Sequence, residues 1–536
     1  MPDSGITSIH ENHTAIARAQ DHIKSSLVLL LAISMVVRGF LAAWLELGND
    51  EVYYRIYAMF PDWSHFDHPP MLGWMMQLFS LNLLFDSEFF LRFSSVIIFV
   101  INTLVIYDAG KILRDELTGL YAALLYNASI YAFVITGIFI LPDTPQSLFW
   151  LLSVNLMLRI FGQSRPENQQ DKLMLLLGLT IGLGMISKYS SVFLWVGLLL
   201  FILFCQSNWL RRPALYGALL ISALCGIPVI WWNLQHDFIS FAYQSGRVSA
   251  FVTSFRPDLF ITELSGQIFY NNPVNFVLIW LAIIAVRRQK QFLPVKTQRL
   301  LLVTALPTIL LFLLFSMFRP TLPHWTGPAY TTLILLAAAR LRQLQYASER
   351  PKIPKMVWLS LSVLGLILIV GSLQIKFGII PIPDNDPYHR LGKHDVTLDM
   401  YGWRNLDKSF QEVRDKQVTA GNMQLTDAIV SDNWFPLANI DYYVARPLGM
   451  KALGLGRPEK LHEYTWINER RGGLKTGDSY WYLTTSREYR HPDQLYAGLF
   501  SQIIASDTIT IMRGGRPAKR VFVFMLKDLQ QIPAWE

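Results

Sequence analysis

Long apolar stretches separated by short polar segments occupy most of the first 375 residues of the chain. A helix needs about 20 mostly apolar residues to cross a bilayer. The pattern gives eleven candidate spans, at residues 26–45, 91–110, 118–139, 146–161, 173–187, 190–206, 214–232, 273–287, 299–317, 325–341 and 356–375. After about residue 376 the chain is more polar and alternates strand-like stretches such as "SYWYLTTS" and "RVFVFML" with helical ones. The sequence therefore predicts an α-helical polytopic membrane protein with a C-terminal α+β domain.

The composition supports a membrane protein. Of the 536 residues, 52% are hydrophobic and 16% are charged, whereas soluble domains usually carry about a quarter charged residues. The formal net charge of +8 indicates basic cytoplasmic loops rather than binding to nucleic acid, so no nucleic-acid partner is predicted. The two cysteines, Cys205 and Cys225, both lie in apolar runs, which favours core or lipid-facing positions over a disulfide or a metal site.

The basic residues set the predicted orientation. If the N-terminus is cytoplasmic, the strongly basic short loops around residues 111–114, 165–172, 211–212, 287–299 and 340–355 all fall on the cytoplasmic side, as the positive-inside rule requires. The C-terminus then lies outside the cytoplasm. The predicted parts are a cytoplasmic segment 1–25, a transmembrane domain 26–375 with a first outer loop 46–90, and an extracytoplasmic domain 376–536.

The first outer loop opens with an unusual stretch, "NDEVYYRIYAMFPDWSHFDHPP", which follows the first apolar run directly. Asp50 and Glu51 come after a good helix N-cap residue, so they could be helix-dipole acids on a solvated loop. Tyr53 and Tyr54, three and four residues after Asp50, would lie on the same helical face. The segment that follows is apolar enough to lie at the membrane surface. These features favour a functional role for the two acids.

A second acid, Asp143 in "LPDTPQ", emerges on the same predicted side between two spans. Two carboxylates at one membrane face suit chemistry in which a hydroxyl must lose a proton near lipid. Burial and a neighbouring like charge can raise the pKa of a carboxylate and make it a better base. Taken alone, an acid such as Asp143 is more often the N-cap of the following helix, with Pro142 and Pro145 shaping the turn.

Three further residues stand out in the outer turns. Lys188 in "GMISKYSSVF" is a basic residue on the side that otherwise avoids Lys and Arg in short turns. It could snorkel to the interface, or it could hold a lipid phosphate. His68 in "FDHPP" and His324 in "LPHWTGP" match no local metal motif, so no metal site is predicted from them. Hydrogen bonding to a phosphate or a sugar suits them better. Trp325 is either an interface-belt aromatic or a sugar-stacking platform.

Five motifs in this order, "NDEVYYRIY", "FDHPPMLGWM", "LPDTPQSLFW", "GMISKYSSVFL" and "PHWTGPAY", resemble the bacterial glycosyltransferases related to protein O-mannosyltransferases. That group includes the aminoarabinose transferases that modify lipid A. The resemblance covers roughly residues 25–345 and lies in the ordered set rather than in any single motif. It implies a GT-C membrane fold at the bacterial cytoplasmic membrane. It also implies inverting transfer of a sugar, on the outer face, from a polyprenyl phosphate carrier to an acceptor hydroxyl.

The resemblance also implies roles for particular residues. The family's catalytic acid after the first span maps onto Asp50 and, less directly, onto Glu51, and its acid in the second outer turn maps onto Asp143. Its lysine near the fifth span corresponds to Lys188. The residues expected to bind the donor phosphate or sugar are Lys188, Tyr53, Tyr54, Arg55, His68, Arg247, His324 and Trp325.

The implied partners are membrane lipids, the polyprenyl-phosphate sugar donor, and a lipid A or other lipopolysaccharide, glycan or protein acceptor. No cofactor is required, and a role for a divalent metal ion is left open.

Two other functions compete with this one. A lipid-sugar flippase or another transporter would place charged residues within spans or along a cavity, often with internal repeats. The acids of interest in this chain lie mostly in outer turns instead. An O-antigen ligase or polymerase would also use polyprenyl-linked donors. The "DE" after the first span and the "DTP" after the third favour the mannosyltransferase-like group, while the sugar, the carrier and the acceptor stay open.

Overall fold

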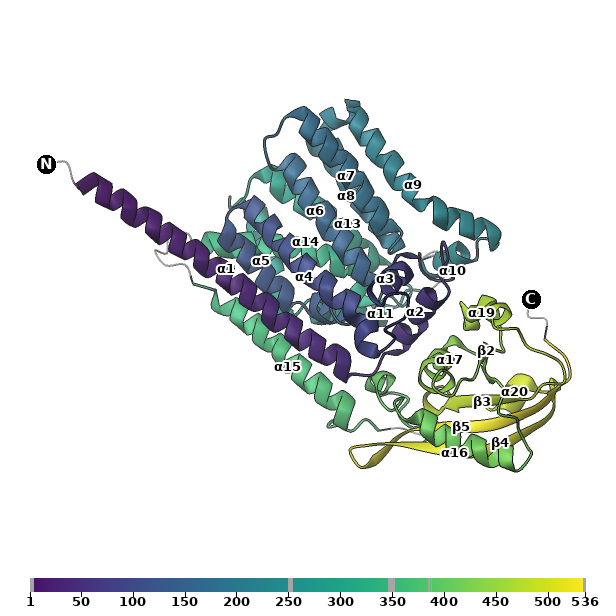
Figure 1. Ribbon diagram of the computed structural model, residues 1–536. Coiled ribbons are helices and arrows are strands. Elements are labelled where there is room, and N and C mark those ends of the chain that lie inside the picture. Colours follow the sequence, from purple (N-terminus) through teal and green to yellow (C-terminus); the bar gives the residue numbers. More distant parts are fainter. Residues whose placement is uncertain (1–3, 249–253, 346–351, 384–385, 387, 534–536) are drawn as a thin grey trace. The chain divides into compact units, whose positions relative to one another are not determined.

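A computed structural model describes residues 4–248, 254–345, 352–383, 386 and 388–533 (Figure 1). The chain divides into two compact units. One, the helical unit, comprises residues 1–42 and 62–366, and the other, the sheet unit, comprises residues 43–61 and 367–536. The short segment 43–61 thus belongs with the C-terminal part of the chain, although it lies between two parts of the helical unit in sequence.

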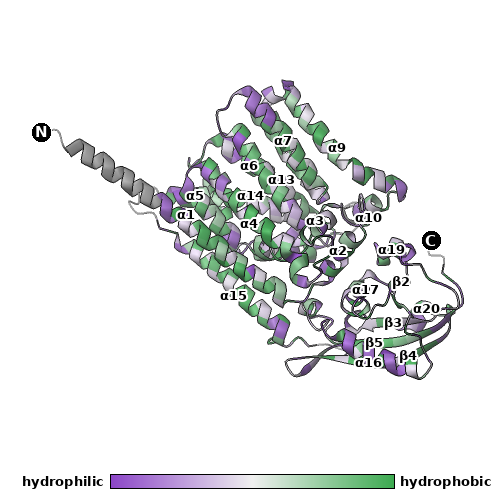
Figure 2. Cartoon of the chain, in the orientation of Figure 1, coloured by the Kyte–Doolittle hydropathy of each residue, from purple (hydrophilic) through white to green (hydrophobic). Residues whose placement is uncertain are grey.

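Each of the eleven predicted segments overlaps an α-helix. The helices are α1 (Ser4–Trp44), α4 (Glu88–Leu113), α5 (Glu116–Ala128), α6 (Asp143–Phe161), α7 (Glu167–Met185), α8 (Phe193–Cys205), α9 (Pro213–Gln235), α12 (Pro273–Arg287), α13 (Val295–Ser316), α14 (Gly327–Leu344) and α15 (Lys355–Phe377). Figure 2 shows apolar residues along many of them. Shorter helices lie between these: α2 (Asn49–Met59), α3 (Met71–Phe79), α10 (Ile239–Val248) and α11 (Pro257–Tyr270).

By length and apolar composition, fewer than eleven of these helices are candidate membrane spans. Within the described residues, five are long and apolar enough: residues 20–44 of α1 together with α4, α9, α13 and α15. A sixth arises if α11 and α12, which meet at a bend of 99°, count as one broken span. The predicted eleven spans and the N-in, C-out orientation stay predictions.

Hydrogen bonds between polar side chains tie the helical unit together. α4 and α6 run parallel, because Asn102 of α4 donates to Ser147 of α6 at 2.8 Å, and further along both helices Asn155 of α6 donates to Asp108 of α4 at 2.8 Å. The indole of Trp150 on α6 donates to Thr332 on α14 at 2.9 Å. Such bonds, and close backbone contacts, replace the hydrophobic driving force that lipid does not supply between helices.

The sheet unit is a five-stranded sheet in the order β2-β1-β3-β5-β4. The strands are β1 (Ile429–Ser431), β2 (Ala452–Gly454), β3 (Tyr480–Thr485), β4 (Phe500–Arg513) and β5 (Arg516–Leu529). β1 pairs in parallel with β2 and β3, whereas β5 pairs antiparallel with β3 and β4. Helices α16 (Leu406–Thr419), α17 (Trp434–Ile440) and α19 (Tyr464–Arg470) complete the unit. The predicted α+β domain is therefore confirmed, with "SYWYLTTS" on β3 and "RVFVFML" on β5.

The segment 43–61 is bound to the sheet unit by several specific contacts. Arg404 donates to the carbonyl of Trp44 at 3.1 Å, which satisfies an acceptor at the end of α1. The backbone N–H of Trp403 donates to the Glu46 carboxylate at 2.6 Å. The hydroxyl of Tyr443 accepts a bond from a backbone N–H in the same segment at 2.7 Å. These contacts hold the start of α2 against the sheet unit, so the predicted first outer loop 46–90 is shared between the two units.

Candidate functional site

Asp143 lies in a buried polar cluster of the helical unit, in the first turn of α6. The ammonium group of Lys188 donates to Asp143 Oδ2 at 2.7 Å, and both side chains are buried. The hydroxyl of Tyr131 donates to Oδ1 at 3.4 Å. His324 Nε2 lies 4.0 Å from Oδ2. The structure thus brings together three predicted site residues, Asp143, Lys188 and His324, which are far apart in the sequence.

Local structure explains how Lys188 reaches Asp143. After α7 ends, Lys188 precedes a short 3₁₀ helix, Tyr189–Val192, in which the "SKYSS" turn is folded. Gln146 lies almost one turn after Asp143 on α6, and its amide donates to Ser190 at 2.8 Å and to Ser191 at 3.1 Å. These hydrogen bonds hold the turn against the start of α6. Lys188, just before the turn, therefore reaches Asp143 in the first turn of α6.

A break in the preceding helix positions Tyr131. α5 ends at Ala128, and the chain continues as a π-helix, Tyr131–Ile135, in which the Thr136 N–H donates to the Tyr131 carbonyl at 3.0 Å. Such π-turns occur frequently at functional sites. Gly327, at the start of α14, makes room for the tyrosine, since a Cβ atom at Gly327 would lie 2.3 Å from its ring. The glycine of "PHWTGPAY" therefore lets the Tyr131 ring approach Asp143.

A buried arginine supports the same π-helix. Arg38 of α1 is fully buried, and its Nε donates to the Phe133 carbonyl at 3.4 Å. Its guanidinium carbon lies 3.2 Å from the centroid of the Phe99 ring and 3.5 Å from that of Phe133. A charged side chain inside an apolar span is a sign of function. The sequence analysis did not single out Arg38 or Tyr131, although Arg38 stands alone as a cation in the predicted span 26–45.

The sequence analysis suggested a raised pKa for Asp143, but the structure gives a lowered one. Burial, the largest single effect, raises the pKa, but the charge and hydrogen bond of Lys188 and the nearby histidines together outweigh it and lower the pKa from its ordinary value. The carboxylate is therefore ionised at neutral pH and serves as an ion-pair partner. Burial also lowers the pKa of His324 from 6.5 to about 4, against the opposing charge of Asp143, so its imidazole is neutral at neutral pH.

The lowered pKa of His324 predicts a pH dependence of stability. As pH falls from about 6.5 to about 4, the unfolded chain takes up a proton at His324 that the folded protein resists, so the free energy of unfolding decreases. Each pKa unit corresponds to about 1.4 kcal/mol. His324→Gln removes this titration and should make the Tm in detergent less sensitive to pH across that window. Equal slopes of Tm against pH in the two proteins would show that His324 does not titrate in this way.

Asp50 and Glu51 lie in the first turn of α2, within the sheet unit. The Glu51 carboxylate accepts the Gly48 N–H at 2.8 Å, so Glu51 caps the helix that begins at Asn49. The expected N-cap, Asn49, is replaced in this role by Gly48. Asp50 is exposed beside it. The two acids thus differ: Glu51 is buried and stabilises the helix start, whereas Asp50 is exposed.

The other predicted residues of α2 are buried against the sheet unit. Tyr53 accepts a hydrogen bond from the Glu463 N–H at 3.3 Å, and its ring centroid lies 5.1 Å from that of Trp434. The guanidinium carbon of Arg55 lies 5.3 Å from the centroid of the Tyr442 ring. Tyr54 is buried too. Their contacts give these residues a packing role, and their predicted role in donor binding stays a prediction.

The remaining predicted residues belong to the helical unit. His68 lies in the loop before α3, where its charge acts on Asp143. Trp325 lies in a 3₁₀ helix, with its ring centroid 5.5 Å from that of Phe312. Arg247 lies near the end of α10, and its side chain falls outside the described residues. Among the residues whose placement is described, no group of three or more His, Cys, Asp or Glu side chains could hold a metal ion.

Known proteins resemble the chain both in sequence and in structure. The family model for dolichyl-phosphate-mannose-protein mannosyltransferase matches residues 67–232. A lipid A galacturonosyltransferase, RgtD of Rhizobium johnstonii, is 22% identical over 422 residues, which cover 77% of this chain and 81% of that protein.

Two crystal structures of ArnT from Cupriavidus metallidurans share the fold over nearly the whole chain. The apo structure has a TM-score of 0.59 at 14% identity, and the match covers 94% of this chain and 98% of that chain. The structure bound to undecaprenyl phosphate has a TM-score of 0.60 at 13% identity, covering 92% and 97% of the two chains. The chain has the GT-C fold. The predicted resemblance to glycosyltransferases of the ArnT and mannosyltransferase type is confirmed.

The family model and the fold match differ in which of the candidate acids they cover. The mannosyltransferase model covers Asp143 and Lys188 but begins after α2, so it says nothing of Asp50 and Glu51. The GT-C fold match, in contrast, covers nearly all of the chain. Together the comparisons support a multi-pass membrane glycosyltransferase of GT-C fold.

Proposed function

We propose that this protein is an inverting glycosyltransferase that moves a sugar from a polyprenyl phosphate carrier to an acceptor hydroxyl at the outer face of the bacterial inner membrane. The observation that carries the proposal is the buried pair of Asp143 and Lys188, in the region that the mannosyltransferase model matches. The ArnT structure bound to undecaprenyl phosphate supports a donor of this class. The relative RgtD, a lipid A galacturonosyltransferase, favours lipid A as the acceptor.

Lys188 is suited to the departing phosphate. An ammonium group has three N–H donors, and one of them is directed to Asp143. The others can bind phosphate oxygens, where the positive charge stabilises the negative charge that develops as the carrier leaves. Asp143 then acts as a positioning residue, because its ion pair holds the ammonium group in place. His68 and the neutral His324 can add hydrogen bonds to the donor.

Asp50 is our candidate for the general base. Its carboxylate takes the proton of the acceptor hydroxyl while the hydroxyl oxygen forms a bond to the anomeric carbon of the sugar. The bond from that carbon to the phosphate oxygen breaks, and the electron pair leaves with the polyprenyl phosphate. Attack from the face opposite the leaving group inverts the configuration. A positioned base typically contributes about 10²–10⁴ in rate. This step needs no cofactor, and a role for a divalent metal ion stays open.

The acceptor can be tested in the cell. Mass spectrometry of lipid A, other envelope glycans and envelope proteins from a deletion strain should show lipid A that lacks the mass of one sugar. A plasmid copy of the wild-type gene should restore that mass. Unchanged lipid A, together with the loss of a sugar from a protein or another glycan, would contradict lipid A as the acceptor. Unchanged envelope molecules of every class, with the lipid-linked sugar confined to the inner leaflet, would favour a transporter over a transferase.

A further inference from the structure

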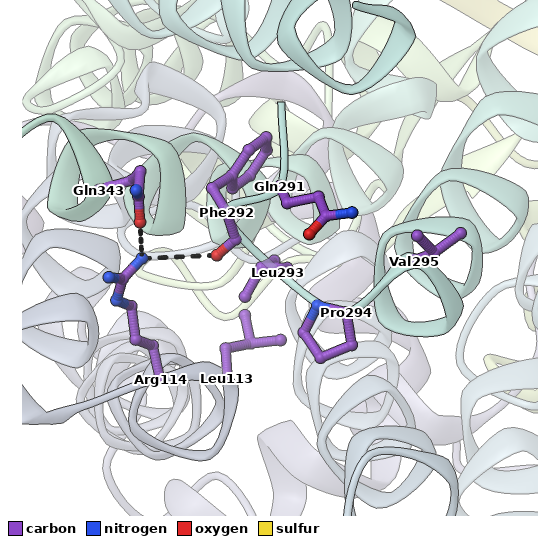
Figure 3. A pocket seen from close by; sticks show the side chains of 8 residues that line it. All are labelled: Leu113, Arg114, Gln291, Phe292, Leu293, Pro294, Val295 and Gln343. Atoms are coloured by element: carbon purple, nitrogen blue, oxygen red, sulfur yellow. Dashed lines mark hydrogen bonds between the residues drawn. The ribbon is translucent and has the colours of Figure 1, made fainter. Parts of the chain in front are cut away.

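The helical unit contains a second polar pocket, of about 480 Å³. It is lined by Leu113, Arg114, Gln291, Phe292, Leu293, Pro294, Val295 and Gln343 (Figure 3). The guanidinium of Arg114 donates to the side-chain oxygen of Gln343 at 2.6 Å and to the carbonyl of Phe292 at 3.4 Å. One part of the lining is thus cationic and amide-rich, while the leucines, proline and valine make the rest apolar. Known small-molecule pockets span roughly 300–1,000 Å³, so the size fits a small headgroup.

This pocket lies at the other end of the helices that carry the Asp143 cluster. Ser95, in the first half of α4, is 3.4 Å from Thr144 at the start of α6. Near the other ends of the same helices, Arg159 forms an ion pair with Asp108. α4 ends at Leu113, the first pocket residue. Since a helix rises by about 1.5 Å per residue, Asp143 and Arg159 on α6 are about 24 Å apart along the helix axis. The pocket is therefore separate from the proposed transfer site.

The pocket also lies where membrane spans end. Leu113 is the last residue of α4, and Val295 is the first residue of α13. Both helices are long and apolar enough to cross a membrane. An opening at the common end of two spans faces the level of lipid headgroups. This argument holds for either orientation of the chain in the membrane.

The surroundings of the pocket are strongly basic. The guanidinium carbon of Arg340 lies 5.8 Å from the centroid of the Phe292 ring. The loop and helix ends beside the pocket expose Arg287, Arg288, Lys290 and Arg299. Among the described residues, two nearby acids have basic partners, since Asp115 pairs with Arg342 at 2.7 Å and Glu116 pairs with Lys111 at 3.0 Å. Basic residues near an anionic membrane surface are attracted to it.

We propose that this pocket binds the headgroup of an anionic glycerophospholipid from the adjacent leaflet. Arg114 would give up its long contact with the Phe292 carbonyl and donate to the phosphate instead, and the Gln343 and Gln291 amides would bind the polar end of the headgroup. The apolar residues, Leu113, Leu293 and Val295 among them, would contact the first carbons of the acyl chains. The lining comes from α4, the loop before α13, α13 itself and α14, so a bound lipid would hold these elements together.

The test uses the full-length protein in a neutral detergent. Phosphatidylglycerol should raise the Tm and should bind by native mass spectrometry, whereas phosphatidylcholine should do neither. Arg114→Gln keeps a polar side chain but removes the charge, and it should weaken phosphatidylglycerol binding about tenfold or more. The matched control is Arg211→Gln, which removes an exposed charge from another basic loop and should bind like the wild type. Val295→Trp, which fills the pocket at an exposed position without changing charge, should also abolish the shift in Tm.

The outcomes separate the sources of the ligand. If Arg114→Gln and Val295→Trp bind phosphatidylglycerol as tightly as Arg211→Gln does, the pocket is not the binding site. If soluble glycerol 3-phosphate at equal concentration gives the same shift in Tm, the site binds a free phosphate rather than a lipid, and the proposal is wrong. The test requires no sugar transfer, so its result is independent of the proposed enzymatic function.

Discussion

Replacing Asp50 by Asn should lower the rate of sugar transfer at least about a hundredfold, the smaller end of what a general base contributes. Asparagine keeps the size and hydrogen-bonding capacity of the side chain but cannot take a proton from the acceptor. Asp50 is exposed in the first turn of α2, so the substitution should leave folding and membrane insertion intact. Binding of the lipid-linked donor should also be unchanged. The measurement is the initial rate of transfer by purified protein, with insertion checked by yield and by size-exclusion chromatography.

Glu51→Gln is the matched control, because it removes a neighbouring charge of the same kind from the same helical turn. Glutamine still offers an oxygen to the Gly48 N–H that Glu51 caps, so transfer should fall much less than in Asp50→Asn. Near-normal transfer by well-inserted Asp50→Asn would remove the catalytic base from this account. A larger loss in Glu51→Gln would assign the base to Glu51.

Replacing Lys188 by Ala should abolish transfer and also destabilise the protein. Without the ammonium group, Asp143 would be left buried in its ionised form with its main cationic partner gone, and such losses cost about 3–5 kcal/mol. Donor binding should weaken because the phosphate loses a cation. Lys188→Arg keeps the charge with a different geometry and should rescue stability in part. The measurements are the Tm and the affinity for polyprenyl phosphate in detergent.

The double variant Lys188→Met with Asp143→Asn separates stability from chemistry. Removing both charges avoids an unpaired buried carboxylate, so the Tm should return toward that of the wild type. Transfer and donor binding should stay low, because the cation is still absent. If the double variant regains transfer as well as stability, Lys188 has only a structural role. If Lys188→Ala leaves both the Tm and donor affinity unchanged, Lys188 is an interfacial residue and the proposed phosphate site is wrong.

The helices could be predicted because apolar runs of this length leave few alternatives. Each predicted span overlaps an α-helix, but one of them does not follow a single helix. The predicted span 118–139 is interrupted after Ala128, where the π-helix that carries Tyr131 begins. No local pattern announces this break. Arg38, a residue 95 positions before Phe133, donates to the Phe133 carbonyl within the π-helix, a contact that the local sequence does not reveal.

The candidate site shows the same limit. The motifs located Asp143, Lys188 and His324, and their types indicated phosphate and proton chemistry. The pKa of Asp143 moves down rather than up because Lys188, 45 residues later in the chain, lies against it. Similarly, Arg404 reaches the Trp44 carbonyl across 360 residues and helps to assign the α2 segment to the sheet unit. Single-sequence patterns report local structure, and these contacts are long-range, so only the folded chain shows them.

The stereochemistry of transfer tests the central claim most directly. Purified protein would be supplied with a polyprenyl-phosphate sugar of known anomeric configuration and with lipid A, and the product would be examined by mass spectrometry and NMR. The account predicts a covalent sugar–lipid A product with inverted anomeric configuration, together with one released polyprenyl phosphate per sugar transferred. A product with retained configuration, or donor consumption without any covalent transfer to an acceptor, would contradict it.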